Sequence, residues 1–243
     1  MALLKGAQIT WLGHATFKVT TAQKKVILID PWIEGNPKSP AQARHLTKVD
    51  FILVTHGHSD HINDVVPTAQ KFNNAKVLAM VETAKWISSQ GVKNVIGFNI
   101  GGSVKVQDDI TFSMTPAFHS SGIDSKTEKT TVYGGEAVGY VIELENGLKL
   151  YHAGDTCAFG DMQLIRKLYA PDIAMLPIGD YYTMGPKGAA LSVRLLGVKH
   201  VIPMHYGTFP ALTGTPKQLK HELHRLGLKS VKVIEMTPGE TIT

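Results

Sequence analysis

The sequence predicts a mixed α/β protein that is built as one domain from two similar halves. Each half starts with short segments rich in β-branched residues and continues as alternating strands and helices. With 243 residues, the chain is long enough to bury a sizeable core. No stretch has the composition of a linker between domains. We therefore expect residues 1–243 to form a single α/β domain.

The first half is predicted to contain one strand that is covered on both faces. The apolar run FILVT at residues 51–55 is continuous rather than alternating, which is typical of such a strand. A proline-rich loop at residues 31–40 precedes it. The predicted strands are residues 8–11, 16–20, 25–30, 51–55, 76–80, 94–98, 103–106 and 110–115, and the predicted helices are residues 65–72 and 81–90.

A polar stretch at residues 119–135 is rich in Ser, Thr and Gly and has no apolar period. It predicts a long loop, and long loops in compact domains are often functional. After it, the pair Asn146-Gly147 predicts a tight hairpin turn. The predicted strands of this half are residues 139–144, 149–152, 173–177, 200–204 and 231–234, and the predicted helices are residues 161–169, 187–196 and 216–226.

Composition excludes several classes of protein. The lone cysteine, Cys157, cannot form a disulfide within the chain. No apolar run approaches the roughly 20 residues that a membrane-spanning helix needs. The segment from Met1 to Gly6 is too short and too soon polar for a signal peptide. These observations predict a cytoplasmic protein without a membrane span.

The net charge of +5 comes from lysines and arginines that are scattered rather than clustered. Because no basic run with interleaved aromatic residues is present, the sequence carries no strong signal for nucleic-acid binding. We expect a small molecule as the partner. The sequence is silent on oligomeric state, and a homo-oligomer stays open.

The most informative segment is His56-Gly57-His58-Ser59-Asp60-His61, which directly follows the predicted buried strand. Its three imidazoles and one carboxylate are ligands of zinc and other divalent ions. Four ligands exceed the three that a protein usually gives to one catalytic zinc. The segment therefore predicts two metal ions. We prefer this to a histidine-rich surface loop, because the cluster lies at the end of a core strand.

Two metal ions need further ligands, and three candidates each follow a predicted strand. They are His119, Asp155 and His205. Taken singly, a histidine at a strand end is more often a hydrogen-bonded structural residue, and an aspartate often caps a turn. Together, the three supply what the first cluster lacks.

The order of these seven residues resembles the metallo-β-lactamase superfamily. Flanking motifs are similar to a branch of metal-dependent hydrolases related to ascorbate-6-phosphate lactonase and to the phospholipase D that cleaves N-acylphosphatidylethanolamines. The motifs are WLGHAT (residues 11–16), DPW (30–32), PAFHSS (116–121), LPIGD (176–180) and MHYGTFP (204–210). The resemblance covers nearly the whole chain, but it does not fix a substrate.

The resemblance implies a four-layer αββα sandwich with the site at one edge of the paired sheets. The implied ligands are His56, His58 and His119 for a first metal ion, Asp60, His61 and His205 for a second, and Asp155 as a bridge between them.

Such a centre predicts hydrolysis. Two divalent ions about 3.5–4 Å apart can share a hydroxide and lower its pKa toward neutrality, which makes it a nucleophile. After the negative charges of Asp60, Asp155 and the hydroxide are counted, the centre keeps about one positive charge. We therefore expect an ester, lactone or phosphodiester bond in a small anionic substrate. Zinc is the first expectation for the metal, and manganese, nickel and iron are alternatives.

Besides Asp60, two residues are candidates for a part in catalysis. His14 and Asp180 each follow a predicted strand. Either would orient a ligand imidazole or protonate the leaving group, or would instead satisfy a buried backbone group. Cys157 is soft enough to matter to a metal if it points inward, but a small buried residue is the preferred interpretation.

Three other functions stay open. A nuclease or phosphodiesterase acting on nucleic acid would use the same centre, but it would favour a basic groove or an added clamping domain, and the sequence shows no such insertion. A redox iron protein of the same fold usually carries glutamate at the position of His58, so the histidine in this sequence argues against that function. A metal-binding protein without activity would be expected to have lost ligands, whereas this set is complete.

Overall fold

The computed structural model describes residues 3–106, 109–125 and 129–243. Most of its strands belong to two sheets. The first sheet contains β1 (Gln8–Trp11), β2 (Phe17–Thr20), β3 (Val26–Ile29), β4 (Phe51–Leu53), β5 (Lys76–Met80), β6 (Val95–Phe98) and β16 (Thr241–Ile242). The second contains β7 (Ser103–Lys105), β8 (Thr111–Pro116), β11 (Val138–Glu143), β12 (Lys149–His152), β13 (Ile173–Pro177), β14 (His200–Met204) and β15 (Lys232–Val233).

The two sheets have the same pattern of pairing. Their strand orders are β16-β1-β2-β3-β4-β5-β6 and β7-β8-β11-β12-β13-β14-β15. Read in these directions, each sheet has three antiparallel pairings followed by three parallel ones. The similarity of the two halves in the sequence thus corresponds to a similarity in topology.

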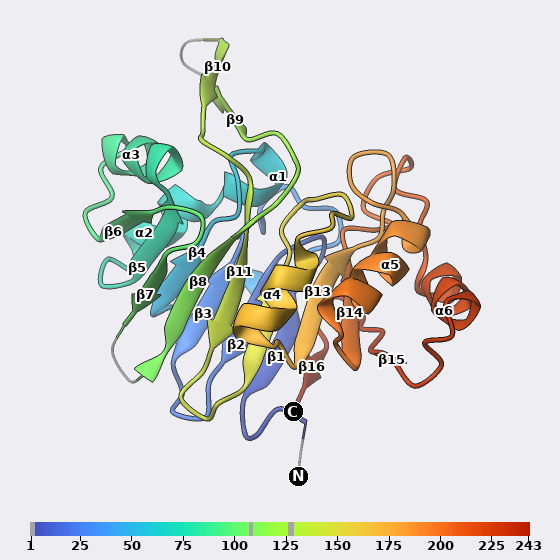
Figure 1. Ribbon diagram of the computed structural model, residues 1–243. Helices are drawn as coiled ribbons and strands as arrows, with labels where there is room; N and C mark the ends of the chain where they lie inside the picture. Colours follow the sequence, from blue (N-terminus) through green and yellow to red (C-terminus); the bar gives the residue numbers. More distant parts are fainter. Residues whose placement is uncertain (1–2, 107–108, 126–128) are drawn as a thin grey trace.

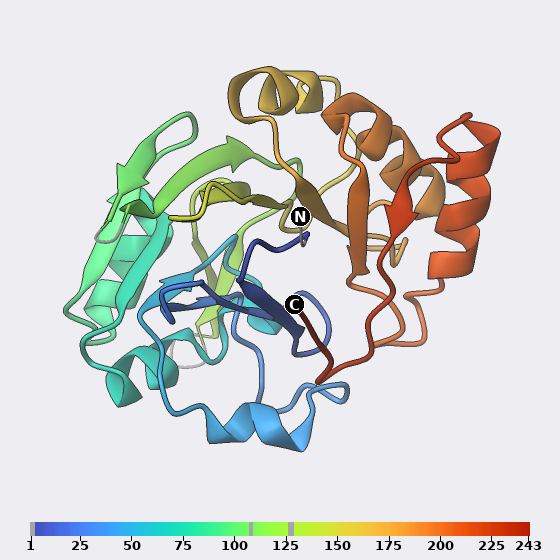
Figure 2. The same ribbon diagram turned by 90° about the horizontal axis from the view of Figure 1, so that it is seen from below.

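Helices cover the outer face of each sheet (Figure 1, Figure 2). The helices of the first half are the 3₁₀ helix η1 (Ala41–His45), α1 (Ser59–Ile62), α2 (Val65–Lys71) and α3 (Val81–Ser89). Those of the second half are α4 (Met162–Tyr169), α5 (Pro186–Leu196) and α6 (Pro216–Arg225). No helix in the described ranges is both long and apolar enough to span a bilayer.

The side chains of the central strands explain why their sequences are continuously apolar. Phe51 and Leu53 of β4 pack in the core between the two sheets, whereas Ile52 points to the layer of α1–α3. In the second sheet, Met175 of β13 lies in the central core and Leu176 packs under α4–α6. Because successive side chains alternate between two buried faces, no polar position is left. The predicted four-layer αββα sandwich is confirmed.

One predicted loop is wrong. Within residues 119–135, the structure has two strands, β9 (Gly122–Ser125) and β10 (Thr130–Tyr133), which form a separate antiparallel pair. In Figure 1 this pair projects from the edge of the sandwich. Ile123 packs into the core beneath α1–α3, but most of the other described side chains of the pair are at least partly exposed. Such a strand pair leaves little apolar alternation for a sequence pattern to show.

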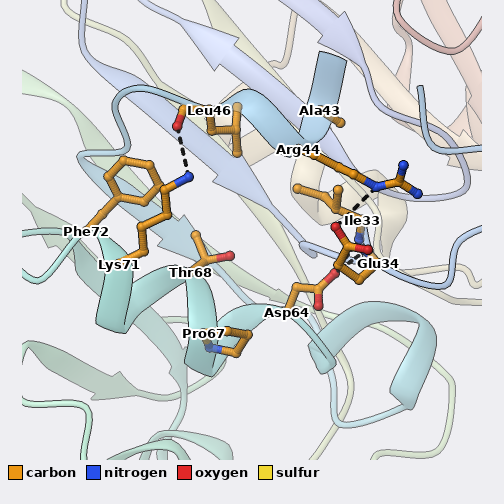
Figure 3. A pocket seen from close by; sticks show the side chains of 10 residues that line it. All are labelled: Ile33, Glu34, Ala43, Arg44, Leu46, Asp64, Pro67, Thr68, Lys71 and Phe72. Carbon is orange, nitrogen blue, oxygen red and sulfur yellow. Dashed lines mark hydrogen bonds and ion pairs between the residues drawn. The ribbon is translucent and has the colours of Figure 1, made fainter. Parts of the chain in front are cut away.

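A pocket of about 180 Å³ lies beside α2 and η1 (Figure 3). Its charged side chains contact one another or the backbone. Arg44 Nε lies 3.1 Å from Glu34 Oε1, Lys71 Nζ donates to the carbonyl oxygen of Leu46, and Asp64 accepts a hydrogen bond from the backbone N–H of Glu34. None of the predicted metal ligands lines this pocket.

Candidate metal centre

The segment from His56 to His61 leaves the carboxyl end of β4 and turns into the short helix α1. His56 is 1% exposed and His61 is fully buried, whereas 24% of the Asp60 side chain is exposed. The turn needs Gly57, because a Cβ at this position would clash with the side chain of Ile123. The loop therefore holds two imidazoles inside the protein and one carboxylate at the boundary with solvent.

The other three predicted ligands lie at one edge of the second sheet. His119, Asp155 and His205 follow β8, β12 and β14. Strands β8 and β12 are both antiparallel to β11, and β12 and β14 are both parallel to β13. All three strands therefore end at the same edge. The backbone N–H of Val138 donates to the carbonyl oxygen of Thr55, which ties this edge to the loop after β4.

The carboxylate of Asp155 is the central group of the cluster. Its Oδ2 lies 3.0 Å from Nε2 of His205 and 3.3 Å from Nε2 of His61. The same oxygen lies 3.7 Å from Nε2 of His119 and 3.9 Å from Nε2 of His56. One carboxylate oxygen thus lies close to four imidazole nitrogens that come from three segments of the chain.

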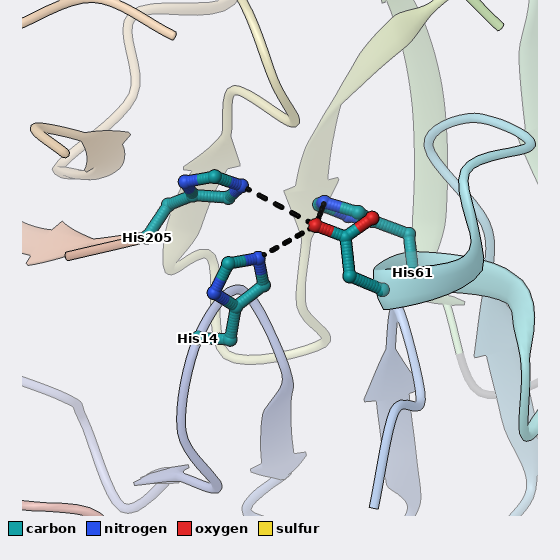
Figure 4. Close-up of side chains that lie close together, drawn as sticks. His14, His61 and His205 are labelled. Carbon is teal, nitrogen blue, oxygen red and sulfur yellow. Dashed lines mark hydrogen bonds and ion pairs between the residues drawn. The ribbon is translucent and has the colours of Figure 1, made fainter. Parts of the chain in front are cut away.

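The candidate ligand atoms form three overlapping groups, and within each group all atoms lie within 4.8 Å of one another. The groups are His56, His58 and His119; His56, His61 and Asp155; and His14, Asp60, His61 and His205. All seven predicted ligands occur in them. Nε2 of His14 and Nε2 of His205 lie 3.0 and 3.7 Å from Oδ2 of Asp60. Figure 4 shows the rings of His14, His61 and His205 converging on one point.

Several buried atoms at the centre of this cluster have no hydrogen-bond partner. Among the described residues, these include Nε2 of His61, Oδ1 of Asp155 and both ring nitrogens of His205. An unpaired buried polar group costs about 1–3 kcal/mol. Divalent metal ions accept imidazole nitrogen and carboxylate oxygen together, and they would satisfy such atoms. The residues present therefore fit metal ions.

Burial favours the neutral form of several imidazoles, which is the form that binds metal. It lowers the pKa of His56 well below its ordinary value, and it also lowers the pKa of His58 and of His119. His205 differs. Burial opposes its charge, but the carboxylates of Asp155 and Asp60 together outweigh burial and raise the pKa of His205 to about 9. The same balance, with Asp155, Asp30 and Asp60 against burial, raises the pKa of His61 well above its ordinary value. A metal ion would replace the proton on His205, because histidine ligates metals as the neutral imidazole.

Asp30 supports the centre, and sequence reasoning gave it no role. Its buried carboxylate accepts hydrogen bonds from the backbone N–H and from Oγ1 of Thr55, at 2.8 and 2.6 Å. It also lies 2.8 Å from Nδ1 of His61. A carboxylate on the second nitrogen of a ligand histidine fixes its tautomer and orientation. The only sequence signal was the DPW motif, which supported the resemblance without indicating a function.

His14 is fully buried in the middle of a hydrogen-bond chain. Its Nδ1 lies 2.9 Å from Oγ1 of Thr208, and its Nε2 lies 3.0 Å from Oδ2 of Asp60. Burial lowers the pKa of His14 to about 4, so the ring is neutral and has one N–H. Because an ionised carboxylate only accepts hydrogen bonds, Nε2–H donates to Asp60 and the Thr208 hydroxyl donates to Nδ1. His14 is thus placed to orient Asp60.

Asp180 and Cys157 lie outside the groups of clustered ligand atoms that the described residues form. Asp180 is exposed, and its Oδ1 accepts a hydrogen bond from the backbone N–H of Tyr181 at 2.9 Å. Its part in catalysis stays a prediction. Cys157 is exposed. The expectation of a small buried residue there is therefore wrong, because the loop after Asp155 turns this side chain to the surface.

Five residues in or beside the site have left-handed backbone although they are not glycine. The φ angles are 55° for His14, 46° for Asp30, 67° for Asp180, 56° for Tyr181 and 55° for His205. Residues with a side chain rarely adopt this conformation. It costs about 1–3 kcal/mol and persists where the surrounding structure holds it, often at functional sites. This backbone conformation therefore costs local stability, and it sets the direction in which these side chains point.

Comparisons with known proteins identify the family. The β-lactamase superfamily domain matches residues 25–206. A UPF0173 metal-dependent hydrolase from Rubrobacter xylanophilus is 48% identical over 240 residues, which cover 99% of this chain and 98% of the relative. Another from Koribacter versatilis is 50% identical over 238 residues, which cover 98% of each chain. The chain therefore belongs to the β-lactamase superfamily and, within it, to the UPF0173 metal-dependent hydrolases.

Solved structures agree with this assignment. The structure of Igni18, a novel metallo hydrolase from the hyperthermophilic archaeon Ignicoccus hospitalis, has a TM-score of 0.83 at 37% identity and covers 97% of both chains. An isothiocyanate hydrolase from Delia radicum gut bacteria has a TM-score of 0.74 at 21% identity, and the match covers 97% of this chain and 98% of the hydrolase chain. The second likeness shows the shared fold alone. The superfamily resemblance and the expectation of a metal-dependent hydrolase are confirmed.

Proposed function

We propose that this chain is a hydrolase with two divalent metal ions, which cleaves an ester, lactone or phosphodiester bond in a small anionic substrate. One observation carries the proposal. The seven candidate ligands converge in three overlapping groups. Oδ2 of Asp155 lies within 4 Å of at least one imidazole nitrogen from each of the three groups. Family membership supports metal dependence and hydrolysis, whereas the number of ions and the bond are inferred from this geometry.

In the proposed centre the ligands fall into two sets and one bridge. They are His56, His58 and His119 for one ion, Asp60, His61 and His205 for the other, and Asp155 for both. Bound there, the ions would supply an activated water molecule as nucleophile and would stabilise negative charge that develops on the attacked group. Zinc is the first candidate, and manganese, nickel or iron would suit the same ligands.

The remaining residues of the site hold these ligands in place. Asp30 orients His61, and His14 orients Asp60. Ser120 Oγ lies 3.2 Å from Nε2 of His58, which leaves Nδ1 of that ring facing the other ligands. Such outer contacts fix the geometry before substrate binds. His14 and Asp180 stay the candidates for donating a proton to the leaving group.

Hydrolysis of chromogenic esters tests the proposal. The protein, loaded with zinc or manganese, is assayed with bis(4-nitrophenyl) phosphate, 4-nitrophenyl acetate and a γ-lactone, beside Asp155→Asn and Asp64→Asn variants. Asp64 is a matched control, because it accepts a backbone hydrogen bond from Glu34 and is not among the clustered ligands. We expect hydrolysis of at least one substrate, with activity lost in Asp155→Asn only. No hydrolysis with either metal, or equal activity of the two variants, would contradict the proposal.

A further inference from the structure

We infer that the substrate carries a flat apolar group, such as an aryl ring, next to the bond that is cleaved, and that aromatic side chains around the mouth of the metal centre bind this group. The inference rests on the proposed function and narrows its substrate class. The side chains, here called the aromatic rim, are Phe118, Tyr181, Tyr182 and Phe209.

The exposure of the ligands shows where a substrate can enter. The side chains of Asp60 and His119 are 24% and 15% exposed. His61, His205 and Asp155 are at most 2% exposed. His58 is also partly exposed. A substrate must therefore reach the centre from the side on which His58, Asp60 and His119 meet solvent.

Two rim residues adjoin site residues, one in the sequence and one in space. Phe118 directly precedes His119 and is 59% exposed. Phe209 is 37% exposed, and its ring centroid lies 5.8 Å from that of His14, whose Nε2 contacts Asp60. The ring of Phe209 therefore lies next to the His14–Asp60 pair, whereas Phe118 precedes the ligand His119 in the loop after β8 and its ring packs on Phe159 at a centroid distance of 5.0 Å.

The tyrosines extend the rim in the loop that follows β13. Tyr181 and Tyr182 are 74% and 56% exposed, and their ring centroids are 4.7 Å apart. They follow Gly179, where a Cβ would clash with the carbonyl oxygen of His205. The turn that carries both tyrosines is thus packed directly against a ligand residue.

Backbone hydrogen bonds join the loops of the rim into one continuous border. The loops follow β8, β12, β13 and β14, which all end at the same edge of the second sheet. The bonds run from the N–H of Cys157 to the oxygen of Phe118, from the N–H of Met184 to the oxygen of Thr156, and from the N–H of Gly214 to the oxygen of Gly179.

Clustering separates this rim from ordinary surface residues. Nine large hydrophobic side chains are exposed in the described part of the chain, and four of them belong to these adjoining loops. Single exposed apolar residues are common, whereas a group beside a concentration of polar ligands indicates a binding site. Aromatic rings bind flat apolar groups with a favourable edge or stacking geometry.

The charges of the same loops argue against a polyanionic substrate. Residues 117–121, 180–184 and 206–212 contain no lysine or arginine. A long nucleic acid would need basic side chains along its backbone. Any anionic group of the substrate is therefore left to the metal ions, and the rim offers apolar contact to the rest of the molecule.

A pair of matched phosphonates tests the inference without relying on turnover. Binding of phenylphosphonate and of methylphosphonate to the metal-loaded protein is measured by titration calorimetry. We expect phenylphosphonate to bind about tenfold more tightly, which corresponds to about 1.4 kcal/mol. Phe118→Ala and Phe209→Ala should each reduce this preference and leave methylphosphonate binding unchanged. Leu168→Ala, which removes a side chain that is 71% exposed on α4, is the control and should change neither affinity.

The outcomes separate this inference from the proposed function. Equal binding of the two phosphonates, or a preference that survives in both phenylalanine variants, would overturn the aryl specificity. The proposed anion site at the metal ions would stand in that case, because methylphosphonate carries no aryl group and its binding does not depend on the rim. If neither phosphonate binds, the proposed anion site fails together with the inference. Unchanged methylphosphonate binding in the variants also shows that they are folded.

Discussion

Replacing Asp30 by asparagine should weaken metal binding, because Asp30 holds His61 in position. The buried carboxylate lies 2.8 Å from Nδ1 of His61 and accepts two hydrogen bonds from Thr55. Asparagine has nearly the same shape, but it lacks the charge and has only one accepting oxygen. The NH₂ group of asparagine would face Thr55 or Nδ1 of His61, which are hydrogen-bond donors as well, so that hydrogen bond would be lost. We expect His61 to lose its fixed tautomer and orientation.

The magnitude follows from two independent estimates. Loss of an outer partner of a ligand histidine typically lowers metal affinity about 10- to 100-fold, or about 1.4–2.8 kcal/mol. A hydrogen bond to a charged group contributes about 1.5–3 kcal/mol, which is the same range. The assay is calorimetric zinc titration of protein that a chelator has stripped of metal. Asp64→Asn is the control, and an Asp30→Asn variant that binds zinc as tightly as this control would refute the reasoning.

Three other properties of the centre can be checked in the same way. His14→Ala should lower kcat about 10- to 100-fold with a smaller loss of bound metal, because His14 orients the ligand Asp60. Steady-state kinetics measure kcat and elemental analysis measures the metal, and an unchanged kcat would contradict an orienting function of His14. Gly57→Ala places a Cβ against the side chain of Ile123 and should lower the free energy of unfolding by about 1–3 kcal/mol. Gly160→Ala, where a Cβ meets nothing within 4 Å, should be close to neutral in the same denaturant titration, and equal losses would contradict the argument. Since the pKa of His205 is raised to about 9 and that of His61 is raised well above its ordinary value, metal binding at neutral pH should release protons from both, and the part that comes from His205 should fade as the pH rises through about 9. Calorimetry in two buffers of different ionisation enthalpy detects the protons, and heats that do not depend on the buffer would count against their release.

The central strands could be predicted because burial on both faces requires an apolar residue at every position. The run at residues 51–55 contains β4, and Phe51, Ile52 and Leu53 are all buried because both faces of the strand are covered. The strands β9 and β10 escaped prediction for the opposite reason. Their burial rests mainly on Ile123, and one or two apolar residues do not make a period.

The clustering of the seven candidate ligands could be predicted because the sequence shows both their residue types and their positions after strands. Asp30 could not be assigned in this way, because its function depends on a contact with His61 across 31 positions of the chain. The left-handed backbone of Asp30 has only a weak local signal, since aspartate adopts this conformation more often than most residues but far less readily than glycine. Cys157 was misjudged because the orientation of a side chain in a loop depends on packing elsewhere in the fold.

The number of metal ions per chain tests the central claim most directly. Elemental analysis is made on protein purified without added metal, beside the Asp155→Asn variant and the Asp64→Asn control. The two-metal account predicts about two ions per chain in the unchanged protein and in the control, with fewer in Asp155→Asn because the bridging charge is gone. One ion or none, unchanged by the loss of the Asp155 carboxylate, would contradict it.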